Sequence, residues 1–354
     1  MPRPVPSLAP FIASLPKVEL HLHLEGSVQP ATLRELARAK NRLKRETNDW
    51  IAERESRSFR YRDFADFLNA FKLVSLLLDS PADYALATTR LIEALAAENV
   101  QYAEITLAAG VLLWKKQPVD AVFEAVSEAA HETTARTGVR VNWIFDAIRQ
   151  FGAAHAREVL AWAGRYRSQG VVAFGIGGDE ARGPAELFAE VYREARDLGL
   201  HTTAHAGEAA GPESVRQAVE LLGAERIGHG LTAAEDSGVL ALLRDRGVPL
   251  EVCLTSNVAT GVLARIEDHP LPKLLESGVA VTLSTDDPAM FDTTLTRELE
   301  LAAGQFALSR EQIVALNENA IRAAFLGDNR RRELLADLRQ AVVPPVKTLR
   351  TKTI

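Results

Sequence analysis

Eight short segments with strand character recur along this chain, and they constrain its fold more than any other feature. From the second segment onward they follow one another at regular intervals, and helical patterns such as 185–198 and 212–222 lie between them. The second of these helices is expected to start at Pro212 and to end before Gly223. The eight segments are 17–24, 100–107, 140–146, 171–176, 201–205, 225–229, 249–254 and 279–284.

A strand followed by a helix, repeated eight times, predicts an α/β fold of the (β/α)₈ TIM-barrel type. We expect residues 1–354 to form a single barrel domain. The alternative is an open, doubly wound parallel sheet, which seldom needs eight regular repeats. The stretch Gly175-Ile-Gly-Gly-Asp179 lacks the third glycine of a dinucleotide-binding fingerprint.

The connection between the first and second strands is much longer than the others, so extra helices are predicted there. Segment 41–72 is expected to form a helical lid over the barrel mouth. Its charged part, 41–62, is more typical of a solvated surface helix. Its second part carries an apolar stripe of Phe64, Phe67, Leu68 and Phe71. Residues 1–14 are expected to form an N-terminal arm, and 344–354 a frayed tail.

Charge and cysteine content exclude several classes of protein. Lys and Arg number 41 against 47 Asp and Glu, so the net charge of −6 argues against a nucleic-acid partner. Cys253 is the only cysteine, which excludes an intrachain disulfide and a cysteine-rich zinc site. There is no apolar run long enough to span a membrane and no convincing signal peptide. We therefore expect a cytoplasmic protein without a membrane partner; the oligomeric state is left open.

Ionisable residues gather at the carboxyl ends of the predicted strands, where barrels of this kind carry their active sites. His21 and His23 are two residues apart on one strand, so both side chains face the same way, about 6 to 7 Å apart at Cα. With His205 and Asp286 they offer three nitrogens and one carboxylate, a set that suits Zn²⁺, or Fe²⁺ or Co²⁺ in its place. The six residues at this rim are His21, His23, His205, His229, Asp286 and Asp287.

The remaining histidines are predicted to be structural. His201 lies four residues before His205, roughly 13 Å further down the same strand. His131 and His155 fall on helical patterns, and His269 precedes Pro270 in a predicted loop. We expect these three side chains to be solvated or packed.

Four motifs in this order resemble those of the adenosine deaminase family of metal-dependent amidohydrolases. They are Leu15-Pro-Lys-Val-Glu-Leu-His-Leu-His-Leu-Glu-Gly26, His205-Ala-Gly-Glu208, Arg226-Ile-Gly-His-Gly230 and Ser284-Thr-Asp-Asp-Pro288. The resemblance runs from about Leu15 to about Phe325. It implies a (β/α)₈ barrel with one Zn²⁺ per chain that removes ammonia from a purine.

The resemblance also implies a role for each residue. His21, His23, His205 and Asp286 would hold the metal. Glu208 would be the proton donor, His229 would act on the attacking water, and Asp287 would be a third catalytic group. His23, Glu25, Gly178 and Asp287 would contact the substrate. Asp179 and Glu180 are expected to cap the helix that follows them.

Two departures from relatives that act on adenosine concern the substrate. The first motif ends in Glu25 where those enzymes usually have Asp, and Thr106 and Ala109 stand where they usually have Arg and Pro. A small-molecule 6-aminopurine nucleoside is favoured, and adenosine and aminodeoxyfutalosine both remain open. The alternative is adenine, or a non-nucleoside substrate of another amidohydrolase, since a fold does not fix a function.

Overall fold

The computed structural model describes residues 8–42, 44–54 and 61–342, and its centre is a barrel of eight strands. Neighbouring strands are parallel and pair in sequence order. A bridge between Leu22 and Asp286 joins the first strand to the end of the last, so the barrel closes. The predicted TIM barrel is confirmed. The strands are β1 Lys17–His23, β2 Val100–Leu107, β3 Arg140–Ile148, β4 Val171–Gly177, β5 His201–Ala206, β6 Arg226–His229, β7 Leu250–Val252 and β8 Val281–Leu283.

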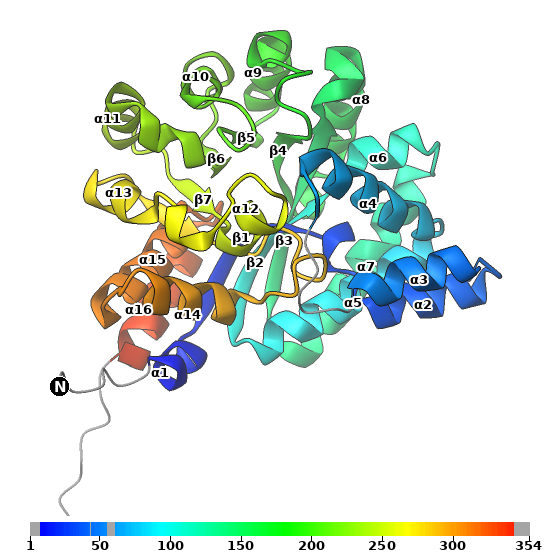
Figure 1. The fold of residues 1–354 in the computed structure, drawn as a ribbon. Helices are drawn as coiled ribbons and strands as arrows, with labels where there is room; N and C mark the ends of the chain where they lie inside the picture. Colours follow the sequence, from blue (N-terminus) through cyan, green and yellow to red (C-terminus); the bar gives the residue numbers. More distant parts are fainter. Residues whose placement is uncertain (1–7, 43, 55–60, 343–354) are drawn as a thin grey trace, which may run out of the picture.

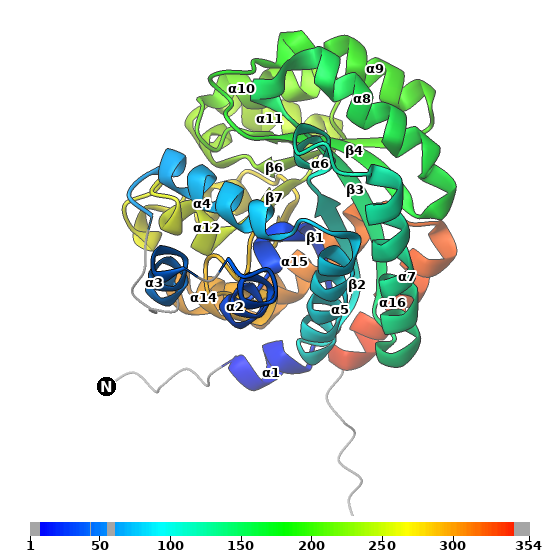
Figure 2. The ribbon, with the colours of Figure 1, turned by 90° about the vertical axis from the view of Figure 1, so that its right-hand side faces the viewer.

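Helices surround the strands in both ribbon views (Figures 1 and 2). The predicted helix 185–198 is a 3₁₀ turn, Ala185–Phe188, followed by α9, and the predicted helix 212–222 is α10 followed by a π-helical turn, Ala218–Leu222. The helices are α1 Ala9–Ser14, α2 Pro30–Ala39, α3 Arg45–Arg54, α4 Phe64–Leu77, α5 Pro81–Ala97, α6 Ala109–Trp114, α7 Val119–Thr137, α8 Gly152–Arg165, α9 Ala189–Asp197, α10 Pro212–Gln217, α11 Ser237–Arg246, α12 Leu254–Ala259, α13 Leu271–Glu276, α14 Leu295–Gln305, α15 Arg310–Ala323 and α16 Asp328–Val342.

Alternation along β3 shows how the strands divide their side chains between two environments. Trp143 and Phe145 pack edge-on against Phe123 of α7, outside the barrel. Ile144 faces inward and packs with Ala173 and Phe325, which close the amino-terminal end of the barrel. Successive inward positions therefore run from an apolar plug toward the carboxyl ends of the strands, where the polar residues lie.

Among its described residues, the long connection before β2 contains four α-helices, α2 to α5, of which α2 and α3 project from one side of the barrel (Figure 1). Within the predicted lid 41–72, residues 43 and 55–60 lie outside the described part. Helix α4 begins where the Asp63 carboxylate accepts the Asp66 amide at 2.8 Å. Of the predicted arm, residues 9–14 form α1 and 1–7 are not described; the predicted tail 344–354 is likewise outside the described residues.

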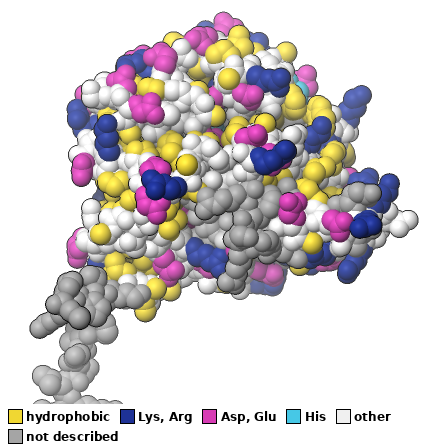
Figure 3. Space-filling model, viewed as in Figure 1, with side chains coloured by type: hydrophobic (Ala, Val, Ile, Leu, Met, Phe, Trp, Pro, Cys, Tyr) yellow, Lys and Arg dark blue, Asp and Glu magenta, His cyan; other side chains and the backbone are white. Residues whose placement is uncertain are grey.

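The visible surface carries mixed charge. Figure 3 shows acidic and basic side chains interspersed on the face seen in Figure 1, without a large field of one sign. Along the described residues, every helix is too short or too polar to cross a lipid bilayer.

Candidate active site

A cavity of about 530 Å³ lies at the carboxyl ends of the strands. Helix α4 forms its apolar side with Phe64, Phe67, Leu68 and Phe71, so the predicted stripe faces the barrel mouth. Seven of the predicted site residues line this cavity: His23, Gly178, His205, Glu208, His229, Asp286 and Asp287. His21 and Glu25 do not line it.

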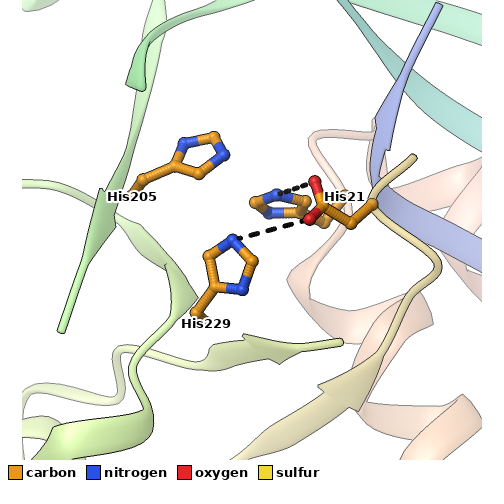
Figure 4. Close-up of side chains that lie close together, drawn as sticks. His21, His205 and His229 are labelled. Carbon is orange, nitrogen blue, oxygen red and sulfur yellow. Dashed lines mark ion pairs between the residues drawn. The ribbon is translucent and has the colours of Figure 1, made fainter. Parts of the chain in front are cut away.

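At and just below the cavity floor, three imidazoles and a carboxylate come together from four strands or strand ends. Candidate ligand atoms of His21, His205, His229 and Asp286 all lie within 4.8 Å of one another. Figure 4 shows the three histidines converging, and their ring centroids are 4.5 to 5.4 Å apart. A second group, His23 with Asp286 and Asp287, adjoins the first, so Asp286 belongs to both.

The hydrogen bonds of two histidines leave one nitrogen of each ring free for a metal. Nδ1 of His21 lies 2.9 Å from Glu251 Oε2, and Nδ1 of His205 lies 3.1 Å from the Ile176 carbonyl oxygen. Both partners are acceptors, so in the neutral form of each ring the proton lies on Nδ1 and Nε2 keeps the lone pair that a metal needs. Within the described part of the chain, the Nε2 of His21 is buried and has no hydrogen-bond partner. Such an orphaned lone pair fits a metal ligand.

Backbone geometry at two strand ends aims the side chains into the cluster. His229 and Asp286 have φ angles of +62° and +64°, in the left-handed region that residues other than glycine rarely adopt. Gly228 on β6 gives His21 its room, because a Cβ there would lie 2.5 Å from the His21 ring. Ser256 donates a hydrogen bond of 2.7 Å to Asp286 Oδ2, which fixes the carboxylate.

A buried chain of hydrogen bonds sets the tautomer of His229. The Leu271 amide donates to Nδ1 of His269 at 3.0 Å, so the proton of this ring is on Nε2, which donates to Asn257 Oδ1 at 3.3 Å. The Asn257 amide nitrogen then donates to Nδ1 of His229 at 3.3 Å. A neutral His229 must therefore carry its proton on Nε2. Burial favours that neutral form, since it lowers the pKa of His229 to about 3.

In this neutral form Nε2 of His229 holds a proton and is a donor, which argues against a role as a metal ligand although the ring belongs to the candidate ligand group. It lies 3.6 Å from Glu208 Oε2 and 4.0 Å from Asp286 Oδ2. The geometry therefore separates His229 from His21 and His205, although all three rings are close together.

Glu208 is buried beside this cluster, and Glu180 fixes the backbone that carries it. The sequence did not predict this role of Glu180. The Glu180 carboxylate accepts the backbone amides of Gly207, Glu208 and Ala209, each at 2.9 Å. Burial raises the pKa of Glu208 well above its usual value, and the carboxylates of Asp286 and Glu180 add to the effect. Glu208 is thus suited to hold a proton, as the resemblance implies.

The expected helix caps at Asp179 and Glu180 were wrong. The next helical turn begins only at Ala185, and Glu180 instead fixes the loop after β5. Asp179 accepts the Ala181 amide at 3.1 Å within a local turn. Three consecutive amides that converge on one carboxylate are a tertiary feature, which a cap pattern in the sequence cannot distinguish from a helix start.

The remaining predicted residues lie at different depths. Asp287 and Gly178 both line the cavity, and Gly178 has a φ angle of +92°. Burial, and then the neighbouring Asp286, raise the pKa of Asp287 well above its usual value. Glu25 is completely buried, and its carboxylate accepts the Ala108 amide at 3.3 and 3.4 Å. Glu25 is therefore separated from the cavity by Ala108, which is one of the lining residues.

The predicted structural histidines are away from this cluster or behind it. His201 stacks on Phe325 at 4.1 Å and lies 2.9 Å from Glu225, and the prediction of a structural role agrees with this placement. His269 is buried, in agreement with the expectation that its side chain is either packed or solvated. It also supports His229 through Asn257. Sequence reasoning did not find that link.

An ion-pair chain lies directly beneath the cluster inside the barrel. Arg226 Nε is 2.5 Å from Glu251 Oε1, and its Nη2 is 2.6 Å from Glu104 Oε2. All three side chains are almost fully buried. Burial alone would raise the pKa of Glu251, but Arg226 and His21 outweigh it and hold this pKa below its usual value. Glu251 is therefore an anion where it meets His21.

Comparisons with known proteins agree with this geometry. The adenosine deaminase family model matches residues 16–341. An aminodeoxyfutalosine deaminase from Streptomyces avermitilis is 37% identical over 318 residues, 89% of this chain and 88% of the relative. An adenine deaminase from Rhizobium rhizogenes is 37% identical over 324 residues, 92% of this chain and 99% of the relative.

A solved structure is similar as well. An amidohydrolase from Burkholderia ambifaria with bound zinc superposes with a TM-score of 0.85 at 25% identity, over 95% of this chain and 94% of the other. The family match spans nearly the whole barrel, including every strand that contributes to the cluster. The chain therefore belongs to the adenosine deaminase family and is a hydrolase that acts on the C–N bonds of purines.

Proposed function

We propose that this enzyme converts a 6-aminopurine nucleoside to the 6-oxopurine product and ammonia with the help of one bound Zn²⁺. The observation that carries the proposal is the pairing of Glu208 with a neutral His229, 3.6 Å apart, beside the His/Asp cluster in one cavity. Hydrolytic deamination needs a proton donor and a group that orients water at the same carbon, and this pair offers both.

His21, His23, His205 and Asp286 would hold the ion. The free Nε2 atoms of His21 and His205 support this set, and imidazole with carboxylate suits Zn²⁺ better than Mg²⁺ or Ca²⁺. The metal would supply Lewis acidity and lower the pKa of water toward about 7. The zinc-bound amidohydrolase of Burkholderia ambifaria has the same fold, which adds support.

The chain's own groups would carry the protons. Glu208, whose raised pKa keeps a proton available, would protonate N1 of the ring and so make C6 open to attack. The Nε2–H of His229 would orient the attacking water and stabilise the charge that develops on its oxygen. Asp287 and the Gly178 backbone, both on the cavity wall, would position the purine.

The sugar end of the pocket supports a nucleoside with a modified 5′ position. The apolar wall of α4 continues to Trp114 and Phe151, whose rings stack at 6.2 Å and which also line the cavity. Trp114 is 44% exposed and Phe151 36% exposed, so this outer wall is available to a larger substrate. Glu25 would act on this end through Ala108 rather than by direct contact. Aminodeoxyfutalosine is thus expected to be accepted at least as well as adenosine.

A panel assay for ammonia release tests the proposal. The zinc-loaded protein is given adenine, adenosine, aminodeoxyfutalosine and other 5′-substituted adenosines, and kcat/KM is measured for each. The proposal requires turnover of nucleosides above adenine, with 5′-substituted nucleosides at least equal to adenosine. Faster turnover of adenine would support the alternative function of the Rhizobium relative. Glu25→Asp is expected to shift the preference toward adenosine.

A further inference from the structure

Asp146 is a buried carboxylate in the cavity wall that none of the steps above uses. It lies near the end of β3, pairs in register with Gly175 of β4, and is 5% exposed. The inward residue before it, Ile144, belongs to the apolar plug, and the one after it, Ile148, lines the cavity together with Asp146. The inward positions on either side of Asp146 along β3 are therefore both isoleucine, and Asp146 is the charged residue between them.

The Asp146 carboxylate has no hydrogen-bond partner among the described residues, and the surrounding charged groups act on it only through their charge. The charged groups that act on it are His23, His21, Arg149 and Glu25. The two Nη atoms of Arg149 donate elsewhere, to the carbonyl oxygens of Gly183 at 2.7 Å and His205 at 2.6 Å, and its Nε has no hydrogen-bond partner among the described residues. Burial raises the pKa of Asp146 to about 7, as expected for a carboxyl group that the protein leaves uncompensated.

Two glycines on β4 make room for this carboxylate. A Cβ at Gly175 would lie 2.7 Å from Asp146 Oδ1, and a Cβ at Gly177 would lie 2.8 Å from Oδ2. The carboxylate therefore sits against the bare backbone of β4, next to Gly178, which we place against the purine. Because Asp146 lines the cavity, a substrate that displaces water from its carboxylate must supply hydrogen bonds in return, since an unpaired polar group away from water is costly.

The chemistry of the substrate limits what that ligand group can be. In its ionised form Asp146 can only accept hydrogen bonds and therefore needs a donor. In a 6-aminopurine nucleoside the ring nitrogens N1, N3 and N7 are acceptors, and the 6-amino group is at the reacting carbon, beside the metal cluster. The donors that remain are the hydroxyl groups of the sugar.

We propose that Asp146 is a specificity-determining residue that accepts a hydrogen bond from a ribose hydroxyl group of the substrate. This inference rests on the proposed function, because it assumes a nucleoside in the cavity. It explains why a carboxylate and two glycines face each other across β3 and β4. It also predicts that a free base, which has no sugar, leaves Asp146 without a partner.

The test compares Asp146→Asn and Asp146→Ala with wild type, each zinc-loaded, on adenosine, 2′-deoxyadenosine and 3′-deoxyadenosine. Wild type is expected to favour adenosine over one of the two deoxynucleosides by at least ~10-fold in kcat/KM. Asp146→Ala is expected to lose at least ~10-fold on adenosine and less than ~3-fold on that deoxynucleoside, so the discrimination disappears. Asp197→Asn, an exposed carboxylate on α9, is the matched control and is expected to change neither value.

Two other outcomes overturn the inference. An equal loss on all three nucleosides would show that Asp146 acts on the metal cluster or on folding instead. A lower melting temperature of metal-free Asp146→Asn would show that the carboxylate stabilises the fold, whereas an unpartnered carboxylate predicts an unchanged or higher one. Failure of the proposed function looks different: wild type would then release ammonia from adenine and not from nucleosides.

Discussion

Glu251 Oε2 lies 2.9 Å from Nδ1 of His21, and this contact decides which nitrogen of the ring faces the cluster. A carboxylate anion can only accept, so a proton of His21 stays on Nδ1, and Nε2 is the nitrogen that faces Asp286, 3.4 Å away. Arg226 on the other side keeps Glu251 ionised. The orientation of a candidate metal ligand is thus set by an ion pair buried inside the barrel.

Glu251→Gln should therefore weaken metal binding more than it weakens folding. A glutamine can still fill the space, but its amide can turn its nitrogen toward His21 and lose the charge that selects the tautomer. We expect the affinity for Zn²⁺ to fall by about 10- to 100-fold, the usual effect of removing such a support. Competition with a chromogenic chelator measures it. Glu276→Gln, an exposed change on α13, is the control, and equal affinities would contradict the role of Glu251.

Metal content tests the cluster directly. One transition metal, most readily zinc, should copurify per chain, and His21→Ala or Asp286→Ala should lose it. Elemental analysis by mass spectrometry gives the stoichiometry, and dialysis against a chelator should abolish turnover, which added Zn²⁺ restores. A metal-free preparation with full activity would remove the basis for the site assignment.

Glu208→Gln separates the proton donor from the metal ligands. The variant should keep its zinc, since Glu208 is outside both ligand groups, and lose at least ~10²-fold in kcat. Glutamine preserves the volume of the side chain but cannot deliver a proton to the purine. Near-native kcat would show that another group protonates N1. Glu213→Gln, exposed at the start of α10, is the matched control.

The sequence was sufficient for the barrel and for the residues at the strand ends. Each strand is a short segment bounded by helical patterns, and the polar residues that end β1, β5, β6 and β8 stand out because stability alone does not place ionisable groups at one rim. His21, His205 and Asp286 were found in this way, and the structure brings their ligand atoms within 4.8 Å.

The supporting residues could not be predicted because their partners are remote in sequence. Glu180 holds amides 27 to 29 positions away, and Glu251 meets His21 across 230 positions. Asp146 looks like an ordinary polar residue near a strand end until the glycines of β4 are seen beside it. Such contacts depend on which strands become neighbours, and a local pattern carries no information on them.

The tautomer of His229 gives the sharpest test of the buried chain from His269 through Asn257. Asn257→Asp replaces the amide donor with a carboxylate oxygen, which would accept a proton from Nδ1 of His229. The proton would then leave Nε2, the atom that faces Glu208 at 3.6 Å. We expect kcat to fall by at least ~10²-fold, as when a catalytic histidine is held in the wrong tautomer.

Asn257→Ala, which merely frees the ring to adopt either tautomer, should cost less than Asn257→Asp although it removes more atoms. Long-range proton–nitrogen NMR of the imidazole nitrogens can follow the change, with protonated Nε2 in wild type and protonated Nδ1 in Asn257→Asp. If Asn257→Asp were the more active of the two variants, His229 would not act as an Nε2–H donor. The activities of the two variants therefore decide the role of His229. The loss of side-chain volume predicts that Asn257→Ala is the less active variant, whereas the reversed hydrogen bond to Nδ1 predicts that Asn257→Asp is.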